Sequence, residues 1–452
     1  MNTKSLYQNR KEFYTDPISG RFNKIRLSTM SFVVFCFFLL PWLSWNGHQA
    51  FLFDVSFNRF YFFGSVFWPQ DFVLISLFFI FFVIALFVVT LYAGRIWCGF
   101  LCPQSIWIKM SAFFSRFFEG KRNNRIKFRN SAFSVNKFFV LFLKHFFWIL
   151  LSIVTSFTFI AYFIPVKWMF FSLISFNIFY NTFFWVLFFG VLTYFNIGWF
   201  KEQLCFLLCP YSRLQSVMFD ESTLIVSYDK ERGEKRGARS KGLDYKLEGL
   251  GDCIDCKKCV TCCPTGIDIR NGLQMECISC GACIDACNEV MLKLDYKPDL
   301  ISFKRENQNF SNKSSSKIKF TLYFIVLLFF LCLLFYFYIN RPLVHFSVTR
   351  GQYQLFNVTK DNFIENFFFV KIMNKSDSDS TYLISVKPNI FTIVGNVDLK
   401  LKPGEMNVLN FTLKTKNVNT ENKFMDVFFY IFDVKNNRLI EKKSRFVLSG
   451  GF

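Results

Sequence analysis

Histidine is scarce and scattered in this 452-residue chain, which contains only His48, His145 and His345. Residues so far apart in the sequence predict no haem or copper site built from histidine alone. Cysteine is absent after Cys332, which excludes the disulfide of antibody domains from the C-terminal part. The first twenty residues are polar and carry no cleavable signal pattern, so we expect the first apolar run to remain as an anchor.

Nucleic-acid-binding patterns are also missing, although the formal net charge is +21. The sequence shows no helix-turn-helix, RNA-recognition or zinc-finger pattern, and many of its basic residues flank long apolar runs. Apolar residues make up 52% of the chain and phenylalanine alone contributes 68 residues, more than a soluble protein could readily bury. The composition therefore indicates a membrane protein and argues against a nucleic-acid partner.

Five apolar stretches are long enough to cross a bilayer as helices, which takes about 20 residues. They are Leu27–Trp45, Phe72–Tyr92, Phe138–Ile164, Phe176–Asn196 and Phe320–Ile339. The segment Trp168–Ser175 is too short to span, and we expect it near the membrane surface.

Loop charges predict how these five spans are oriented. Basic residues gather in the N-terminal tail and in the loop between the second and third spans, at Lys4, Arg10, Lys11, Arg21, Lys24, Arg26, Lys121, Arg122, Arg125, Lys127 and Arg129. The loops on the opposite side offer only Arg59 and Lys167. By the positive-inside rule, the N-terminus and the cysteine-rich loop are cytoplasmic and the C-terminal tail is outside.

The strongest motif is a pair of ferredoxin-type cysteine runs after the fourth span. Fifteen cysteines in a small secreted protein would suggest disulfides, but nine of these fall between Cys253 and Cys287, which favours metal binding. In such runs, three cysteines at CxxCxxC spacing bind one cluster and the fourth reaches across to the other cluster. We assign Cys253, Cys256, Cys259 and Cys287 to one 4Fe–4S cluster, and Cys277, Cys280, Cys283 and Cys263 to the second.

Structural zinc also prefers four thiolates, but a doubled CxxCxxCxxxC is far more specific to iron–sulfur clusters. Asn288 replaces the proline that usually follows the second run, which removes no ligand. Cys262 is surplus to both sets, and we interpret it as a packed small side chain. Nothing in the two runs supplies a substrate pocket, so the function they predict is electron relay.

A second cysteine motif occurs twice, as Cys98/Cys102 followed by Pro103 and as Cys205/Cys209 followed by Pro210. Each CxxxCP follows a pair of spans on the predicted cytoplasmic side, which suggests a duplicated unit. If each pair is helical, its two sulfurs share one face. Soft thiolates there suit Cu(I), a further cluster or a dithiol redox pair, while the simplest alternative is packing of small side chains. Cys36 and Cys332 lie within spans, and we interpret them as packing or lipid-facing residues.

After Ile339 the sequence alternates short β-rich stretches with turn residues. The stretches Phe367–Ile372, Tyr382–Val386, Asn407–Leu413 and Met425–Phe432 predict strands of an immunoglobulin-like sandwich. The predicted fold is thus a multi-domain membrane protein: an α-helical transmembrane bundle, an inserted dicluster ferredoxin-like domain and a C-terminal all-β immunoglobulin-like sandwich. The predicted parts are a tail (1–26), a four-helix membrane region (27–215), the ferredoxin-like domain (216–318), a fifth transmembrane helix (319–340) and the sandwich (341–452).

Longer motifs extend the pattern beyond ferredoxin spacing. They are PWLSWNG (41–47), FWPQDF (67–72), CGFLCPQ (98–104), CPYSR (209–213), DKERGE (229–234), CPTGIDIR (263–270), GLQMECI (272–278) and CIDAC (283–287). With them, nearly the whole chain resembles the cytochrome c oxidase accessory proteins of the CcoG family, also called FixG or RdxA. The departures are Cys262, where an aliphatic residue is usual, and a looser match in the outer domain.

The resemblance implies a multi-pass protein of the bacterial inner membrane with a cytoplasmic ferredoxin-like domain and a periplasmic C-terminal domain. It also implies reduction of Cu(II) to Cu(I) for assembly of a cbb(3)-type cytochrome c oxidase. Under this hypothesis, a cytosolic donor feeds the two clusters, and Cys98, Cys102, Cys205 and Cys209 bind copper as substrate. Membrane lipid and oxidase assembly factors, or a copper chaperone or transporter, are the expected partners.

Two rival functions remain open at this stage. The chain resembles electron-transfer subunits of quinol-oxidising membrane systems, which share CxxxCP hairpins but have four spans and lack the sandwich. Alternatively, the protein is an assembly scaffold whose outer sandwich docks an oxidase and whose clusters are structural. The presence of a fifth span and a sandwich ranks copper reduction first.

Overall fold

The computed structural model describes the chain except residues 1–13, 46, 57, 64, 176–179, 219–222, 240–244, 247, 306–313, 352–355, 360–362, 377, 396, 417–423 and 449–452. The start of the predicted fourth span and half of the N-terminal tail therefore lie outside the described residues. The described residues form two compact units, one of 1–44 and 75–334 and the other of 45–74 and 335–452.

Five helices in the described residues are long and apolar enough to cross a membrane, which confirms the predicted spans. Four are α2 (Phe72–Ala93), α6 (Val135–Ile160), α8 (Tyr180–Phe195, prolonged to Phe200 by a π-helical turn) and α13 (Ser314–Ile339). The fifth, α1 (Arg21–Leu39), begins earlier than predicted. Most side chains along these helices are exposed in the isolated chain, as expected of surfaces that contact lipid.

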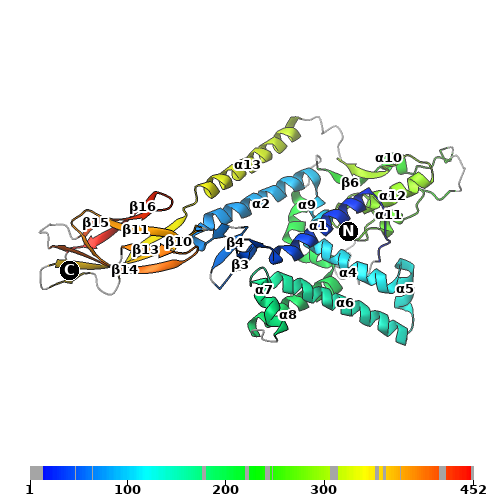
Figure 1. Cartoon of the computed structure of the whole chain (residues 1–452). Coiled ribbons are helices and arrows are strands. Elements are labelled where there is room, and N and C mark those ends of the chain that lie inside the picture. Colours follow the sequence, from blue (N-terminus) through cyan, green and yellow to red (C-terminus); the bar gives the residue numbers. More distant parts are fainter. Residues whose placement is uncertain are drawn as a thin grey trace. The chain divides into compact units, whose positions relative to one another are not determined.

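Shorter helices complete the membrane part of the first unit (Figure 1). They are α3 (Ile96–Phe100), α4 (Pro103–Glu119), α5 (Arg122–Asn130), α7 (Val166–Ile174) and α9 (Pro210–Met218). Helix α4 begins with proline at its first position, where the missing N–H costs nothing, and ends at Gly120 with φ +85°. Glu119 at its end accepts from Lys144 of α6 at 2.7 Å and from Arg125 at 2.8 Å, which ties α4, α5 and α6 together.

The predicted ferredoxin-like part belongs to the same unit. Strands β6 (Ile225–Tyr228) and β7 (Ile301–Lys304) pair antiparallel and bracket it. Between them lie α10 (Lys230–Gly233), α11 (Lys258–Thr261) and α12 (Ala282–Lys293). Val226, Ile269, Ile284, Leu300 and Ile301 form the apolar core on which the cysteine-bearing loops pack.

Helix α1 is joined to α12 at its N-terminal end. The carboxylate of Asp285 accepts from the backbone N–H groups of Phe22, at 3.2 Å, and Asn23, at 2.7 Å. These N–H groups have no partner within their own helix, so a carboxylate from α12 does the work of an N-cap. Gly20 leaves room for it, because a Cβ there would lie 2.2 Å from the Asp285 Cγ. The first membrane helix is thus fixed to the helix that carries Cys283 and Cys287.

The second unit contains the C-terminal sandwich, and the fold class is as predicted. One sheet has the order β12–β14–β10–β8, with β9 on β10, and the other has the order β13–β11–β15–β16. The strands are β8 (Val344–Arg350), β9 (Asn357–Val358), β10 (Phe363–Asn374), β11 (Ser380–Lys387), β12 (Thr392–Val394), β13 (Asp398–Leu401), β14 (Met406–Lys416), β15 (Phe424–Asp433) and β16 (Arg438–Val447). All pairs are antiparallel, and Phe368, Tyr382, Phe411 and Phe429 fill the core between the sheets.

Residues 45–74 fall within the predicted four-helix membrane region (27–215), between its first two spans, and form short strands that the sequence did not predict. They contain β1 (Ser44–Trp45), β2 (His48–Gln49) and a three-stranded sheet of β3 (Phe51–Asp54), β4 (Arg59–Phe62) and β5 (Ser65–Phe67). These residues group with the sandwich rather than with the helices. The link includes a buried ion pair, in which Lys375 Nζ lies 2.7 Å from Asp71 Oδ1. Strands this short leave little periodic signal, which is why the sequence did not predict them.

The ion pair between Lys375 and Asp71 gives a stability prediction. Its side chains are only 2% and 5% exposed, and Asp71 Oδ2 also accepts from Trp68 N at 3.1 Å. Lys375→Ala leaves a buried carboxylate uncompensated, so we expect a loss of about 3–5 kcal/mol in the free energy of unfolding of this unit. Pulse proteolysis of the full chain in denaturant measures it.

Lys443→Ala is the matched control, because its partner Asp426 is exposed and such pairs contribute about 0–1 kcal/mol. Equal losses in the two variants would contradict a structural role for the Lys375–Asp71 pair.

Candidate metal centre

Two small cavities lie within the ferredoxin-like part. Cys253, Cys256, Cys259 and Cys287 line one of them, together with Arg270. This is the set of cysteines that the spacing assigned to the first cluster. The first three come from the loop around α11, whereas Cys287 comes from α12, so this cavity combines three cysteines of the first run with one of the second.

The other cavity brings together the second predicted set. Cys263, Cys277, Cys280 and Cys283 line it, and Cys259 touches it from the first set. Sulfurs converge because the intervening turns adopt left-handed backbone at Lys257 (φ 56°), Ser279 (φ 51°) and Gly281 (φ 72°). Position 281 accepts only glycine, because a Cβ there would lie 2.7 Å from the Phe22 ring.

The donor set of both cavities fits a 4Fe–4S cluster. Each cavity is lined by the four cysteines of one predicted set and by no His, Asp or Glu, and 4Fe–4S clusters bind to four cysteine thiolates. Burial raises the pKa of the thiols of Cys259, Cys277 and Cys287 to about 12, so these ligands need iron to become thiolates at neutral pH. Arg270 lies against the first cavity, where its guanidinium is held by Asp268 at 2.6 Å and by Asp255 at 2.5 Å.

The two CxxxCP motifs share a local structure that differs from one continuous helix. Cys98 lies in α3, but the helix breaks at Leu101, and Cys102 has extended backbone before α4 begins at Pro103. Cys205 lies in the π-helical turn Leu204–Leu208, and Cys209 is likewise extended before α9. Neither pair lies on one continuous α-helix, so the condition for two sulfurs on one helical face is not met. Proline begins the next helix in both copies, because it fixes φ and lacks the N–H.

The four cysteines of the two motifs are neighbours in space. Cys98 is influenced electrostatically by Cys102, Cys205 and Cys209, and Cys205 by Cys102 and Cys209. The pKa of the Cys98 thiol is raised to about 12, mainly by burial and secondly by the nearby Cys102. The same two causes raise the pKa of the Cys205 thiol to about 12. Thiols with such raised pKa values are protonated at neutral pH and lose their protons when they bind a metal.

Side-chain hydrogen bonds connect the two copies of the motif. Gln104, two residues after Cys102, exchanges two 2.7 Å hydrogen bonds with Asn196, which lies at the start of the π-helical turn before Cys205. The Cys98 thiol lies 3.6 Å from Oε1 of Gln215, which is fully buried on α9. The duplicated hairpins thus build one four-cysteine site, here called the CxxxCP site.

The CxxxCP site touches the loop that holds the second cavity. A Cβ on Gly99 would lie 2.7 Å from the Ile278 carbonyl oxygen and 3.0 Å from the Cys280 Cα. The Arg95 guanidinium donates to the Met275 carbonyl and, at 2.8 Å, to the Ser212 carbonyl. One buried arginine therefore joins the helix break before Cys98, the loop before Cys277 and the helix after Cys209.

Three of these residues escaped the sequence analysis. Gly99 and Gln104 lie inside the motif CGFLCPQ, in which only the cysteines were given a role, and Arg95 was not singled out at all. Two signals in the sequence could have indicated this contact. Arg95 is a charged residue close to the end of an uncharged span, and Gly99 inside the CxxxC motif allows a close approach of another backbone segment. Asp285 was hidden between two cluster cysteines, where nothing in the pattern indicated a partner in the first span.

No group of three or more His, Cys, Asp or Glu side chains is placed to hold a metal ion, within the part of the chain that the structure describes. This is equally true of the eight ferredoxin cysteines, because a cubane keeps its four sulfurs further apart than a single ion does.

Comparison with known proteins gives consistent results. A family profile described as "4Fe-4S dicluster domain" matches residues 200–306, one described as "4Fe-4S binding domain" matches residues 75–124, and one for the "IG-like fold at C-terminal of FixG" matches residues 334–449. The chain is 31% identical to Protein RdxA and 32% identical to Protein RdxB of Cereibacter sphaeroides, over 84% and 85% of this chain and 83% of each relative.

Nitrogen fixation protein FixG of Rhizobium meliloti is 37% identical over 66% of this chain, and the match spans 58% of that protein's length. A crystal structure of a FixG-related protein from Vibrio parahaemolyticus matches 24% of this chain and 96% of its own, at 28% identity and a TM-score of 0.22.

The ligand assignment can be tested by metal counting. Cys280→Ser removes a ligand of the second set, so we expect iron and acid-labile sulfide to fall by about half relative to the wild-type protein. Cys262→Ser is the matched control: Cys262 is buried next to Cys263, but its thiol donates to the Cys259 carbonyl at 3.2 Å and lines neither cluster cavity. If Cys262→Ser lost iron and Cys280→Ser did not, the assignment would be wrong.

Proposed function

Since this chain belongs to the FixG/RdxA family, we propose that it is a membrane-bound Cu(II) reductase that supplies Cu(I) for assembly of a cbb(3)-type cytochrome c oxidase. Its 4Fe–4S domains and five apolar helices support the broader statement that it is an iron–sulfur electron-transfer protein of a membrane. The finer proposal rests on one observation, the contact between the CxxxCP site and the loop of the second cluster.

That contact provides a short route for electrons. When bound, each cluster supplies a carrier for one electron. Cys280 is a predicted ligand of the second cluster, and its backbone lies against Gly99, the neighbour of Cys98. Glycine at this position lets the two segments approach to van der Waals distance, and Arg95 holds the surrounding carbonyls in place.

The CxxxCP site has the chemistry of a copper-binding site. Its thiolates are soft ligands, which bind Cu(I) better than Cu(II) and so favour reduction of the bound substrate ion. Cys98, Cys102, Cys205 and Cys209 would hold copper until a chaperone or transporter removes it. Half-burial of all four residues leaves them reachable by such a partner.

The orientation of the protein follows from loop charge. We propose that the ferredoxin-like part is cytoplasmic and that the sandwich is periplasmic, in a bacterial inner membrane, because basic residues gather on one side of the spans. The electron donor would then approach from the cytoplasm or from the bilayer, and oxidase assembly factors would meet the sandwich.

A second candidate is favoured by the family match over residues 75–124, which is described as a 4Fe–4S binding domain and contains Cys98 and Cys102. In that case the CxxxCP site holds a further cluster and extends the electron relay. Iron counting separates the two candidates: a third cluster raises the iron content by about half over two clusters.

The copper proposal predicts the effect of removing the four thiols together. In the variant with Cys98, Cys102, Cys205 and Cys209 all replaced by serine, we expect dithionite-reduced protein to lose its reduction of added Cu(II). A Cu(I)-specific chelator measures the product after excess dithionite has been removed without oxygen. The double variant Cys36→Ser/Cys332→Ser controls for loss of thiols elsewhere. Unchanged copper reduction in the fourfold variant refutes the assignment.

Gly99→Ala tests the electron route without removing a ligand. The added methyl would meet backbone atoms of Ile278 and Cys280, so the two segments must separate. A displacement of about 1 Å at a reacting centre can cost about 100-fold in rate, and we expect a loss of about 10- to 100-fold in copper reduction.

Gly190→Ala on α8 is the matched glycine control, because its methyl would meet only Ser156, at 3.4 Å. Iron content should be the same in both variants. Equal copper-reduction rates with equal iron content would show that the Gly99 contact is not on the route.

A further inference from the structure

A large cavity lies between α1, α4 and the loops of the second cluster. Its volume is about 1120 Å³, slightly above the range of about 300–1,000 Å³ that is typical of small-molecule sites. All the residues that line it belong to the first compact unit. The copper proposal assigns no role to this cavity.

One end of the cavity is apolar and lies along a membrane span. Met30, Val34, Phe35, Phe38 and Leu39 of α1 line it. Phe35 is 61% exposed in the isolated chain, so this wall also faces the lipid side of the span. A hydrophobic chain from the bilayer could occupy this end without leaving an apolar environment.

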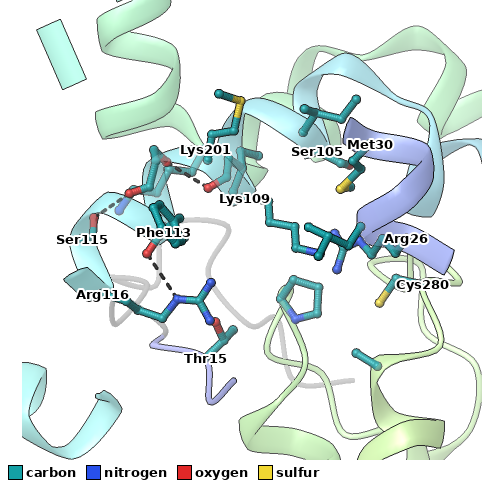
Figure 2. A pocket seen from close by; sticks show the side chains of 18 of the residues that line it. Thr15, Arg26, Met30, Ser105, Lys109, Phe113, Ser115, Arg116, Lys201 and Cys280 are labelled. Atoms are coloured by element: carbon teal, nitrogen blue, oxygen red, sulfur yellow. Dashed lines mark hydrogen bonds between the residues drawn. The ribbon is translucent and has the colours of Figure 1, made fainter. Parts of the chain in front are cut away.

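The other end is polar and touches both the second cluster cavity and the CxxxCP site. Cys280, a predicted ligand of the second cluster, lines it, and so does Cys205 of the CxxxCP site. Figure 2 shows Arg26 and Cys280 at the same side of the cavity, with Ser115 and Arg116 across from them. A molecule bound here would lie in contact with the protein's electron route.

The polar end carries two cations whose neighbours in the described chain do not neutralise them. Arg26 is only 9% exposed, and its Nε has no hydrogen-bond partner among the described residues. Lys109 Nζ donates to the Asn23 side-chain oxygen at 3.4 Å, and no carboxylate within the described ranges pairs with it. The buried Arg26 Nε needs an acceptor, which a ligand with hydroxyl or carbonyl oxygens provides, and the half-buried Lys109 ammonium can donate further hydrogen bonds to the same ligand.

The same cations argue against this cavity as the route for copper. Arg26, Lys109, Arg116, Arg125 and Lys201 all line it, against the carboxylates of Asp16 and Glu202. A surplus of positive charge in a partly desolvated space repels Cu(II). The ligand of this cavity is therefore uncharged or anionic, has an apolar tail and reaches the electron route.

We propose that this cavity binds a membrane hydroquinone, which is the electron donor of the protein. The quinol releases two electrons and two protons and leaves as the quinone, and the electrons pass singly to the two clusters. The overall reaction rests on the proposed copper reduction. In it, one quinol and two Cu(II) give one quinone, two Cu(I) and two protons. Lys109 and Arg26 would hydrogen-bond the oxygens of the ring, and α1 would contact the tail.

Binding and reduction are both testable on the full chain in nanodiscs. Decylubiquinone is titrated calorimetrically against the oxidised protein, and decylubiquinol is added without oxygen while bleaching of the cluster absorption is followed. Val34→Trp fills the apolar end, and we expect at least about a tenfold loss of affinity, equivalent to about 1.4 kcal/mol. Lys109→Gln should weaken quinone binding and slow bleaching by quinol, with bleaching by dithionite retained.

Phe32→Trp is the matched control, because Phe32 lies on the same helix but outside the cavity and is 66% exposed. Wild-type affinity and bleaching in Phe32→Trp, with both reduced in Val34→Trp, support the proposal. Three results overturn it: no quinone binding by the wild type; equal binding by Val34→Trp; or displacement of bound phosphatidylglycerol, not quinone, as the only effect of Val34→Trp.

Failure of the copper proposal is distinguishable from failure of this one. Quinol that bleaches the clusters in a protein unable to reduce Cu(II) refutes the copper step and leaves the hydroquinone site intact. Dithionite-reduced protein that reduces Cu(II), with no response to quinol, refutes the hydroquinone site alone.

Discussion

The docking of the second-cluster loops on the membrane helices is the constraint on which the rest of the structure depends. Asp285 on α12 accepts from the first N–H groups of α1, at 3.2 and 2.7 Å, and Arg95 binds carbonyls on both sides of the CxxxCP site. Gly20, Gly99 and Gly281 permit these approaches, since a Cβ at any of them would come within 3.0 Å of the opposite segment. Without these contacts, the ferredoxin-like part would be a soluble electron carrier on a tether.

This docking places three sets of thiols within one compact unit. Each of the two ferredoxin cavities is lined by cysteines of both runs, and the CxxxCP set joins both membrane hairpins. Burial keeps many of these thiols protonated in the absence of metal, which couples metal uptake to proton release. The large cavity lies where the second cluster, the CxxxCP site and α1 meet, so a donor bound there needs no further relay.

The sequence predicted features whose signal is local. The five spans follow from long apolar runs, and the strands β10, β11, β14 and β15 follow from β-rich stretches between turn residues. The crossed cluster ligands follow from spacing, and the structure groups the same cysteines around two cavities. Features that depend on distant partners were missed. Asp71 carries no sign of Lys375, the break at Leu101 separates two cysteines that helical spacing would align, and Arg95 pairs with carbonyls, which leave no trace in a sequence.

X-ray absorption at the copper edge tests the central claim most directly. The dithionite-reduced full chain would be loaded anaerobically with one equivalent of Cu(II) and compared with its oxidised form. Electron transfer from the clusters to the CxxxCP site predicts Cu(I) surrounded by sulfur alone, together with loss of about half of the EPR signal of the two reduced clusters, because one Cu(II) takes up one electron. Copper that remains Cu(II) with nitrogen and oxygen neighbours, beside clusters that stay reduced, would contradict the account.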